Sequence, residues 1–220
     1  MKRIALALVF CLLLAATGVW ASVIDDPIDW GQLGSSFTVL ATPQPWVSAG
    51  GITGYVGLVN DSNFERLDQG NGWDGNFFPG EHLLWNQGAA SGYDALGLVF
   101  TQAMLGFSTQ VQSNEYGPFV ATLTAYDSSF NVIGQTVMNG VSNSNGDGSA
   151  ITISFDATSS VVWAVSLSVV DMSGNDDEAM GTGVLHRASV APVPEPGSLL
   201  LLASGLTTAA AGIRRRLLSR

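Results

Sequence analysis

The sequence contains a single cysteine, Cys11, and it lies inside an apolar N-terminal segment. Once that segment is removed on export, the chain has no cysteine for disulfide bonds, thiolate metal sites or a cysteine nucleophile. Basic residues are also scarce, because residues 22–191 hold only Arg66 and Arg187 against seventeen acidic residues, a formal charge of −15. This charge excludes nucleic acid as a natural partner, and the fold has to rest on a packed core.

Histidine is nearly as rare, since the chain has only His82 and His186, and we predict that both are structural residues at strand edges. A serine hydrolase needs a histidine beside its serine, and the chain lacks a G-x-S-x-G turn. Two histidines without cysteine also make a poor zinc site. The carboxylate pair of a glycosidase is represented best by Asp74 and Glu81, for which solvated surface is the simpler interpretation. We therefore predict that the protein is not an enzyme.

Residues 1–21 have the three parts of a secretory signal peptide. Two basic residues precede an apolar run from Ile4 to Ala16, and Val19-Trp20-Ala21 then offers a site for signal peptidase. The apolar run is shorter than the roughly 20 residues that a transmembrane helix needs. We predict export of the chain and cleavage before Ser22.

The C-terminal end combines three features in a fixed order. Pro194-Glu195-Pro196 presents a carboxylate on extended backbone, because each proline restricts the residue before it. Residues 197–213 are uncharged over 17 positions, enough for about 25 Å of transmembrane helix. Arg214, Arg215, Arg216 and Arg220 follow and are expected to stay on the cytoplasmic side. A plain membrane anchor that stays in place would also have the last two features.

These three features resemble the PEP-CTERM sorting signal of Gram-negative bacteria, with residues 192–220 covered. The resemblance implies an exported protein that is held transiently in the inner membrane and cleaved there by an exosortase, an integral membrane transpeptidase. It also implies delivery to the cell surface or to the extracellular polysaccharide matrix. The sorting motif that it identifies consists of Pro194, Glu195 and Pro196 with Arg214, Arg215 and Arg216.

The region between the two ends, residues 22–191, is predicted to form one all-β domain. Apolar and polar residues alternate with the period of half-buried strands, and no segment keeps a helical period. The clearest alternation lies at residues 105–112, 119–126, 151–155 and 163–169, with weaker runs at 37–41, 52–59, 82–85 and 96–101. Turn-forming segments at 127–131, 143–148 and 173–177 separate several of these. Nine or ten short strands predict a two-sheet antiparallel sandwich of jelly-roll type.

The same region resembles, diffusely, the ectodomains that accompany this sorting signal. The residues that carry this likeness run from "LDQGNGWDGNFFPGEHLLWNQGA" through "YGPFVATLTAYDSSFNVIGQ" to "GDGSAITISF". It implies a sandwich related in architecture to carbohydrate-binding modules, and it supplies no catalytic residues.

Two acidic loops have the composition of a calcium site. Calcium takes six to eight oxygen ligands from carboxylates, amides and backbone carbonyls, and exported sandwiches use it to fix loops. The candidate ligands are Asp68, Asn71 and Asp74 in one loop and Asp171, Asp176 and Asp177 in the other. Neither loop follows the EF-hand spacing, and a solvated acidic turn is the alternative for each.

Two tryptophans are candidates for glycan binding. A sugar ring stacks its apolar face on an exposed aromatic side chain while nearby polar groups bind its hydroxyls. Trp73 lies between Gly72 and Asp74 in a polar loop, and Trp46 follows Pro45. Packing of the Trp73 ring on the sandwich is the alternative, and Trp85 and Trp163 are predicted to belong to the core.

The sequence thus favours an exported, acidic, non-enzymatic β-sandwich protein of the cell surface or the polysaccharide matrix. Its expected partners are signal peptidase, an exosortase-type enzyme and extracellular polysaccharide. A carbohydrate-binding module, with Ca²⁺ as its candidate cofactor, is the alternative function.

Overall fold

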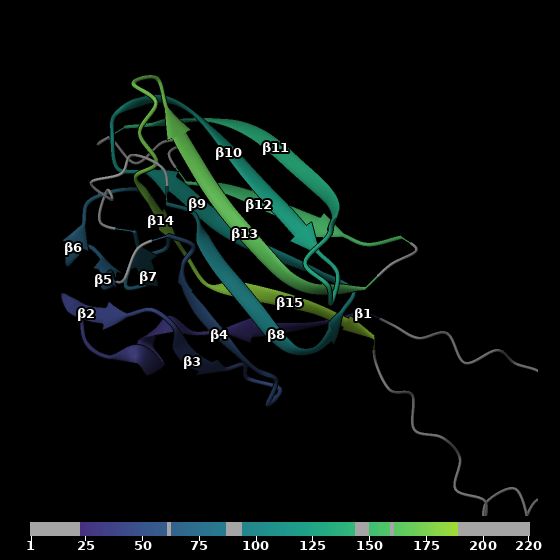
Figure 1. The fold of residues 1–220 in the computed structure, drawn as a ribbon. Helices are drawn as coiled ribbons and strands as arrows, with labels where there is room; N and C mark the ends of the chain where they lie inside the picture. Colours follow the sequence, from purple (N-terminus) through teal and green to yellow (C-terminus); the bar gives the residue numbers. More distant parts are fainter. Residues whose placement is uncertain (1–22, 61–62, 87–93, 144–149, 159–160, 189–220) are drawn as a thin grey trace, which may run out of the picture. The chain divides into compact units, whose positions relative to one another are not determined.

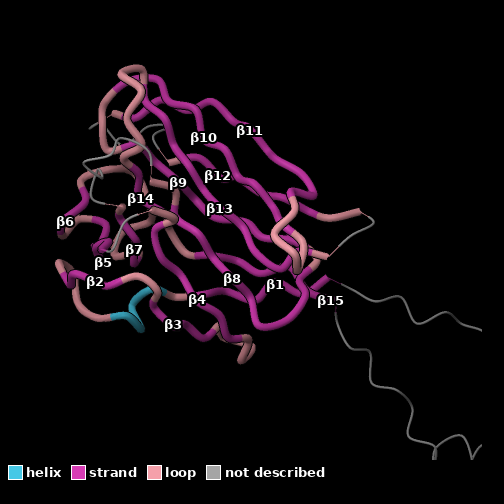
Figure 2. Tube along the Cα trace, in the orientation of Figure 1, coloured by secondary structure: helices cyan, strands magenta, loops and turns pink. Residues whose placement is uncertain are grey.

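The computed structural model describes residues 23–60, 63–86, 94–143, 150–158 and 161–188. The predicted signal peptide and sorting signal both lie outside the described residues. Within the described part, nearly all regular structure is strand, arranged in two sheets (Figures 1 and 2). The all-β, two-sheet antiparallel sandwich predicted from the sequence is confirmed.

The larger sheet contains nine strands. Its path runs through β1 (Val23–Ile28), β15 (Gly183–Ala188), β9 (Gly106–Ser113), β14 (Glu178–Met180), β7 (His82–Trp85), β5 (Asn63–Gln69) and β2 (Thr38–Ala41). Two further strands join it from the side: β12 (Ile151–Asp156) pairs with β9, and β6 (Gly72–Trp73) pairs with β5. All of these pairs are antiparallel except that of β5 with β6. Since β1 pairs with β15, the first and last described strands lie side by side.

The smaller sheet contains six strands and is antiparallel throughout. Its order is β11 (Val132–Ser142), β10 (Gly117–Tyr126), β13 (Val162–Asp171), β8 (Leu96–Met104), β4 (Thr53–Leu58) and β3 (Gln44–Val47). A short 3₁₀ helix, η1 (Trp30–Leu33), follows β1, and Asp29 caps it by accepting a hydrogen bond from the Gly31 amide. The described strands number fifteen, more than the sequence predicted, because several are only two to four residues long.

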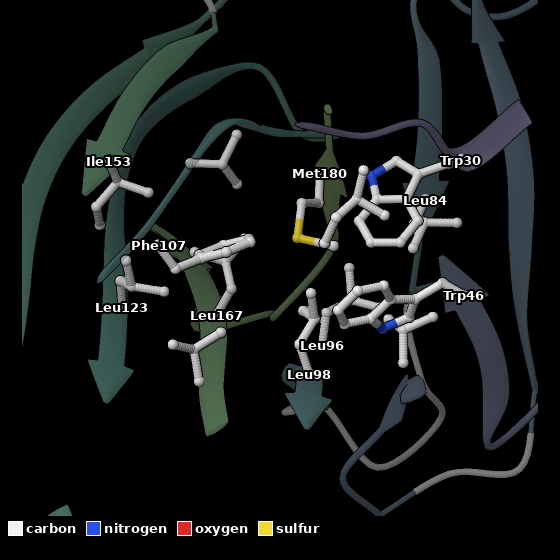
Figure 3. Packing of buried hydrophobic residues seen from close by; sticks show 14 of the residues in the cluster. Trp30, Trp46, Leu84, Leu96, Leu98, Phe107, Leu123, Ile153, Leu167 and Met180 are labelled. Atoms are coloured by element: carbon white, nitrogen blue, oxygen red, sulfur yellow. The ribbon is translucent and has the colours of Figure 1, made fainter. Parts of the chain in front are cut away.

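The core lies between the two sheets and is apolar. In β10 the side chains of Ala121, Leu123 and Ala125 are fully buried, as the alternation predicted, whereas Val120 on the opposite face is exposed. Figure 3 shows Phe107 from β9 and Leu123 and Leu167 from the smaller sheet pointing into one layer, with Trp46 further along it. A second, smaller cluster includes Leu67, Trp73, Phe77, Leu83 and Ala179.

Trp163 departs from the predicted pattern. The register between β13 and β8 shifts between Val162 and Ala164, which reverses the alternation at this point. Val162 and Val165 are buried and Trp163 is only half-buried, so the prediction that Trp163 belongs to the core is wrong. Trp85 is also half-buried and packs on the edge of the smaller cluster.

The predicted turn at residues 127–131 is confirmed. The Asp127 carboxylate accepts hydrogen bonds from the backbone amides of Ser129 and Asn131, and the turn connects β10 to β11. Asp171 organises the turn at 173–177 in the same way, through the amides of Ser173 and Asn175. Most of the predicted loop at 143–148 lies outside the described residues.

None of the helical structure in the described ranges is long and apolar enough to cross a membrane. The predicted transmembrane segment, residues 197–213, falls outside those ranges.

Candidate functional site

Both tryptophans predicted to bind glycan are buried. The Trp73 side chain is 4% exposed, donates a hydrogen bond from Nε1 to the Gln112 side chain at 3.1 Å, and packs edge-on against Phe77 and Trp85. Trp46 is 1% exposed and packs edge-on against Phe100. The expectation that these rings are exposed is wrong, because a polar loop sequence does not fix the direction of the side chain. Neither ring offers a free face to a sugar.

In the first predicted calcium loop, two of the three candidate ligands form contacts with other protein groups. Asp68 forms an ion pair with the buried Arg66, whose Nη1 also donates to the Leu67 carbonyl. The backbone of Asn71 is hydrogen-bonded to that of Asp68, and Asp74 is exposed. Glu81, the partner considered for Asp74 in a glycosidase, instead accepts hydrogen bonds from the backbone amides of Phe78 and Thr182.

The second predicted calcium loop spreads its three carboxylates over different partners. Asp171 caps its own turn, whereas Asp177 accepts hydrogen bonds from the Trp85 indole and the Asn114 amide. Asp176 turns inward and is buried. In the part of the chain that the structure describes, no three His, Cys, Asp or Glu side chains are placed to hold a metal ion. The calcium hypothesis therefore finds no ligand set in either loop.

Asp176 and the neighbouring Glu178 form a buried carboxyl pair at one end of the core. Glu178 is fully buried and accepts hydrogen bonds from the backbone amides of Val169 and Leu96, so it connects β14 to β13 and β8. Asp176 accepts from the Val169 amide and from Ser168 Oγ. Burial, together with the Asp176 carboxylate, raises the pKa of Glu178 well above its ordinary value. The sequence analysis named Asp176 as a candidate metal ligand, but the geometry places it in a structural carboxyl pair with Glu178.

The outer face of the six-stranded sheet is almost free of charge. Among Asp, Glu, Lys, Arg and His, its six strands contain a single residue, Asp171 at the end of β13, although the domain as a whole is strongly acidic. Val47, Val99, Val120, Val137 and Val141 are exposed there. A neutral ligand can therefore bind to this face without removing charged side chains from water, which would be energetically unfavourable.

A hollow of about 310 Å³ lies on this face. Strand pairing places Tyr55 (β4), Val99 (β8), Ala164 (β13) and Tyr126 (β10) in one row across the sheet. At the usual strand spacing the two tyrosines are about 14 Å apart. The adjacent row contains Gly57, Gly97 and Ser166. The Thr42 side chain covers Gly57, whereas only ordinary contacts lie over Gly97, so the floor between the tyrosines is low at Gly97.

We call this hollow the tyrosine groove, defined by Tyr55, Gly57, Gly97, Tyr126, Phe130 and Ser166. Tyr55 is 51% exposed and Phe130 is also exposed, so aromatic surface is available to a ligand. Tyr126 is fixed by a hydrogen bond between its hydroxyl and Ser166 Oγ at 2.9 Å. Sequence reasoning missed the groove because it searched for tryptophan in loops, whereas these rings lie on strands and a β-turn.

Comparison with known families matches residues 192–216 to a family described as the PEP-CTERM protein-sorting motif. The chain carries a PEP-CTERM sorting motif at its C-terminal end. The match includes Pro194, Glu195 and Pro196 and the three consecutive arginines, as the sequence analysis predicted. The PEP-CTERM motif implies export, transient anchoring in the membrane and processing by an exosortase-type membrane enzyme.

Three of the solved structures that resemble this chain are distant likenesses. A DUF4465 family protein from Bacteroides caccae is 9% identical with a TM-score of 0.45, covering 76% of this chain and 100% of its own. The CBM22-1 xylan-binding domain of Paenibacillus barcinonensis Xyn10C is 10% identical with a TM-score of 0.37, covering 80% and 99%. A family 29 carbohydrate-binding module, CBM29-2, is 14% identical with a TM-score of 0.32, covering 73% and 97%. At these TM-scores no ligand is carried over from them, and the comparison with curated proteins found no match.

Replacing Trp73 by Ala is expected to lower the free energy of unfolding by about 3–5 kcal/mol, because it leaves a cavity and removes one of the hydrogen bonds to the buried Gln112 side chain. Phe78→Ala, in the same loop but 72% exposed, is the matched control and should stay within about 0.5 kcal/mol of the parent. Urea unfolding measures both. Equal stability of the two variants would contradict the buried position of Trp73.

The buried carboxyl pair predicts a pH dependence of stability. Because the pKa of Glu178 is higher in the folded protein than in the unfolded chain, the folded state keeps a proton that the unfolded chain has released. The stabilising contribution is complete below about pH 4, the unfolded value, and is lost as the pH rises through the folded pKa. Glu178→Gln, which is neutral at every pH, should remove this loss.

Urea unfolding between about pH 5 and pH 8 tests this expectation, with the exposed Glu115→Gln as control. The free energy of unfolding of the parent and of Glu115→Gln should decrease with rising pH more steeply than that of Glu178→Gln. Parallel curves for all three proteins would show that Glu178 does not hold the proton.

Proposed function

We propose that this chain is an exported cell-surface or matrix protein that binds a neutral polysaccharide through the tyrosine groove. The observation that carries the proposal is the combination of exposed aromatic rings with hydroxyl groups on an uncharged face. Sugar rings stack on aromatic side chains through their C–H faces, and hydroxyl side chains hydrogen-bond to sugar hydroxyls. The groove offers both kinds of contact through Tyr55, Tyr126, Phe130 and Ser166.

The charge of the domain supports a neutral polysaccharide over an acidic one. A domain with a formal charge of −15 repels polyanions at long range, and the described strands of the binding face offer no basic residue that would bind a carboxylate. A neutral polysaccharide is not repelled in this way. This assignment replaces the tryptophans of the sequence-based hypothesis with residues that the fold leaves exposed.

The PEP-CTERM motif supports the route to the surface. We propose that Glu195, held extended between two prolines, is the residue that the membrane enzyme recognises, and that the apolar segment with its arginines is removed with the tail. The mature protein would then leave the membrane and meet polysaccharide outside the cell.

The Glu195→Ala variant tests this route in the native host. The tripeptide loses its only carboxylate, so the full tail should remain and the protein should stay in the inner membrane, with signal peptide cleavage before Ser22 unchanged. Ser198→Ala, just after the tripeptide, is the control and should be processed like the parent. Intact mass and membrane fractionation give the result, and normal release of Glu195→Ala would contradict the proposal.

The tyrosine groove is tested by affinity electrophoresis of the full-length chain in gels that contain hydroxyethylcellulose as a neutral polymer or alginate as an acidic one. The neutral polymer should retard the parent, and Tyr55→Ala should lose about tenfold in affinity through the missing stacking contact. Tyr116→Ala, 68% exposed and outside the groove, is the matched control and should bind like the parent.

Two results would contradict the groove as the binding site. One is equal retardation of the parent, Tyr55→Ala and Tyr116→Ala. The other is a change in oligomeric state of Tyr55→Ala by sedimentation without any loss of retardation, which would make the face a contact between copies of the chain.

A further inference from the structure

The outer face of the nine-stranded sheet brings together a histidine and an aspartate from two different strands. Gly106 in β9 pairs with His186 in β15 on one side and with Asp156 in β12 on the other. A Cβ atom at Gly106 would overlap the Asp156 carboxylate, so the glycine leaves the space in which the two side chains meet. His186 Nδ1 lies 2.5 Å from Asp156 Oδ1.

Ser108 completes the arrangement. It lies two residues after Gly106 in β9 and therefore on the same face of the sheet. Its Oγ lies 3.0 Å from Nε2 of His186. When the proton on Nδ1 is donated to Asp156, the lone pair on Nε2 accepts the hydroxyl proton of Ser108. This is the order of contacts in which a serine is activated by a histidine base that a carboxylate orients.

A hollow of about 570 Å³ opens beside Ser108. The loop Phe78-Pro79-Gly80 borders it on one side, and Gln110, Thr152 and Thr182 line it further along. Glu81 holds this border in place by accepting hydrogen bonds from the amides of Phe78, at 3.2 Å, and Thr182, at 2.8 Å. The nucleophile candidate thus faces an open, bordered space with hydroxyl and amide groups around it.

We propose that Ser108 is the nucleophile of an esterase site that hydrolyses O-acyl esters of small carboxylic acids. Ser108 Oγ attacks the ester carbonyl carbon while His186 Nε2 takes the hydroxyl proton. The tetrahedral intermediate then expels the alcohol, which receives that proton from His186. Water next attacks the acyl-serine, His186 again takes and returns the proton, and the carboxylic acid leaves with Ser108 restored.

The negative oxygen of the intermediate has to be stabilised by side chains. Ser108 lies in the middle of β9 between β12 and β15, where the backbone amides form the hydrogen bonds of strand pairing. Gln110, two residues further along the same face, and Thr152, paired with it in β12, are the donors that line the hollow. This departs from the prediction of a non-enzymatic protein, which rested on the two scarce histidines, the missing G-x-S-x-G turn and the lack of a clear zinc site or carboxylate pair.

The other histidine of the chain provides an internal contrast. His82 Nδ1 also lies 2.5 Å from a carboxylate, that of Asp29, but its Nε2 faces Asp68 at 3.8 Å. A histidine between two carboxylates has no hydroxyl to activate. His82→Gln is therefore a matched control for His186→Gln, and the exposed Ser154, opposite Ser108 in β12, provides a matched control serine.

The test uses the full-length chain in mild detergent with two probes, a fluorophosphonate that labels activated serines and p-nitrophenyl acetate as the ester. The parent, Ser154→Ala and His82→Gln should each gain the mass of one phosphonyl group and hydrolyse the ester. Ser108→Ala should do neither, and His186→Gln should lose at least about a hundredfold in hydrolysis rate. A melting curve verifies that each variant is folded.

The proposal fails if the parent is not labelled and hydrolyses the ester no faster than Ser108→Ala. It also fails if Ser108→Ala is labelled like the parent, because the reactive group would then lie elsewhere. Binding to neutral polysaccharide through the tyrosine groove, on the other sheet, should be the same in the parent and in Ser108→Ala, so the two proposals are tested separately.

Discussion

The contact between the inner faces of the two sheets is the interaction on which the rest of this structure depends. The exported domain has no cysteine, so no disulfide bond can join the two sheets, and apolar packing has to hold them together. Among its aromatic rings, the centroids of Trp46 and Phe100 lie 6.1 Å apart and those of Phe100 and Phe107 lie 6.2 Å apart. Because the inner faces of the two sheets form the core, ligand binding and catalysis are confined to the outer faces and the loops.

The two outer faces differ in character because charge is distributed unequally between the sheets. The smaller sheet is nearly uncharged and has exposed aromatic rings beside a low floor at Gly97, which suits a neutral, ring-shaped ligand. The larger sheet contains both histidines and most of the carboxylates of the strands, and there polar side chains from neighbouring strands meet. Glu178 links the sheets at one end, because its buried carboxyl group accepts hydrogen bonds from backbone amides of β13 and β8.

The sequence predicted those features that depend on local pattern. Alternation in β10 and the Asp127 turn were recovered because side-chain direction there follows the strand period and local hydrogen bonds. Trp73 was misassigned because Gly72, with φ of 104°, and the buried Gln112 turn the ring inward. Ser108, Asp156 and His186 could not be grouped, since their proximity depends on the register of three strands distant in sequence. The tyrosine groove depends on strand register in the same way.

A crystal structure of the protein with a neutral oligosaccharide, such as cellohexaose, tests the central claim most directly. The account predicts sugar rings lying over Gly97, with at least one ring stacked on Tyr55 and hydroxyls bonded to Tyr126 or Ser166. An oligosaccharide bound on the nine-stranded sheet, or an empty tyrosine groove at saturating ligand, would contradict it.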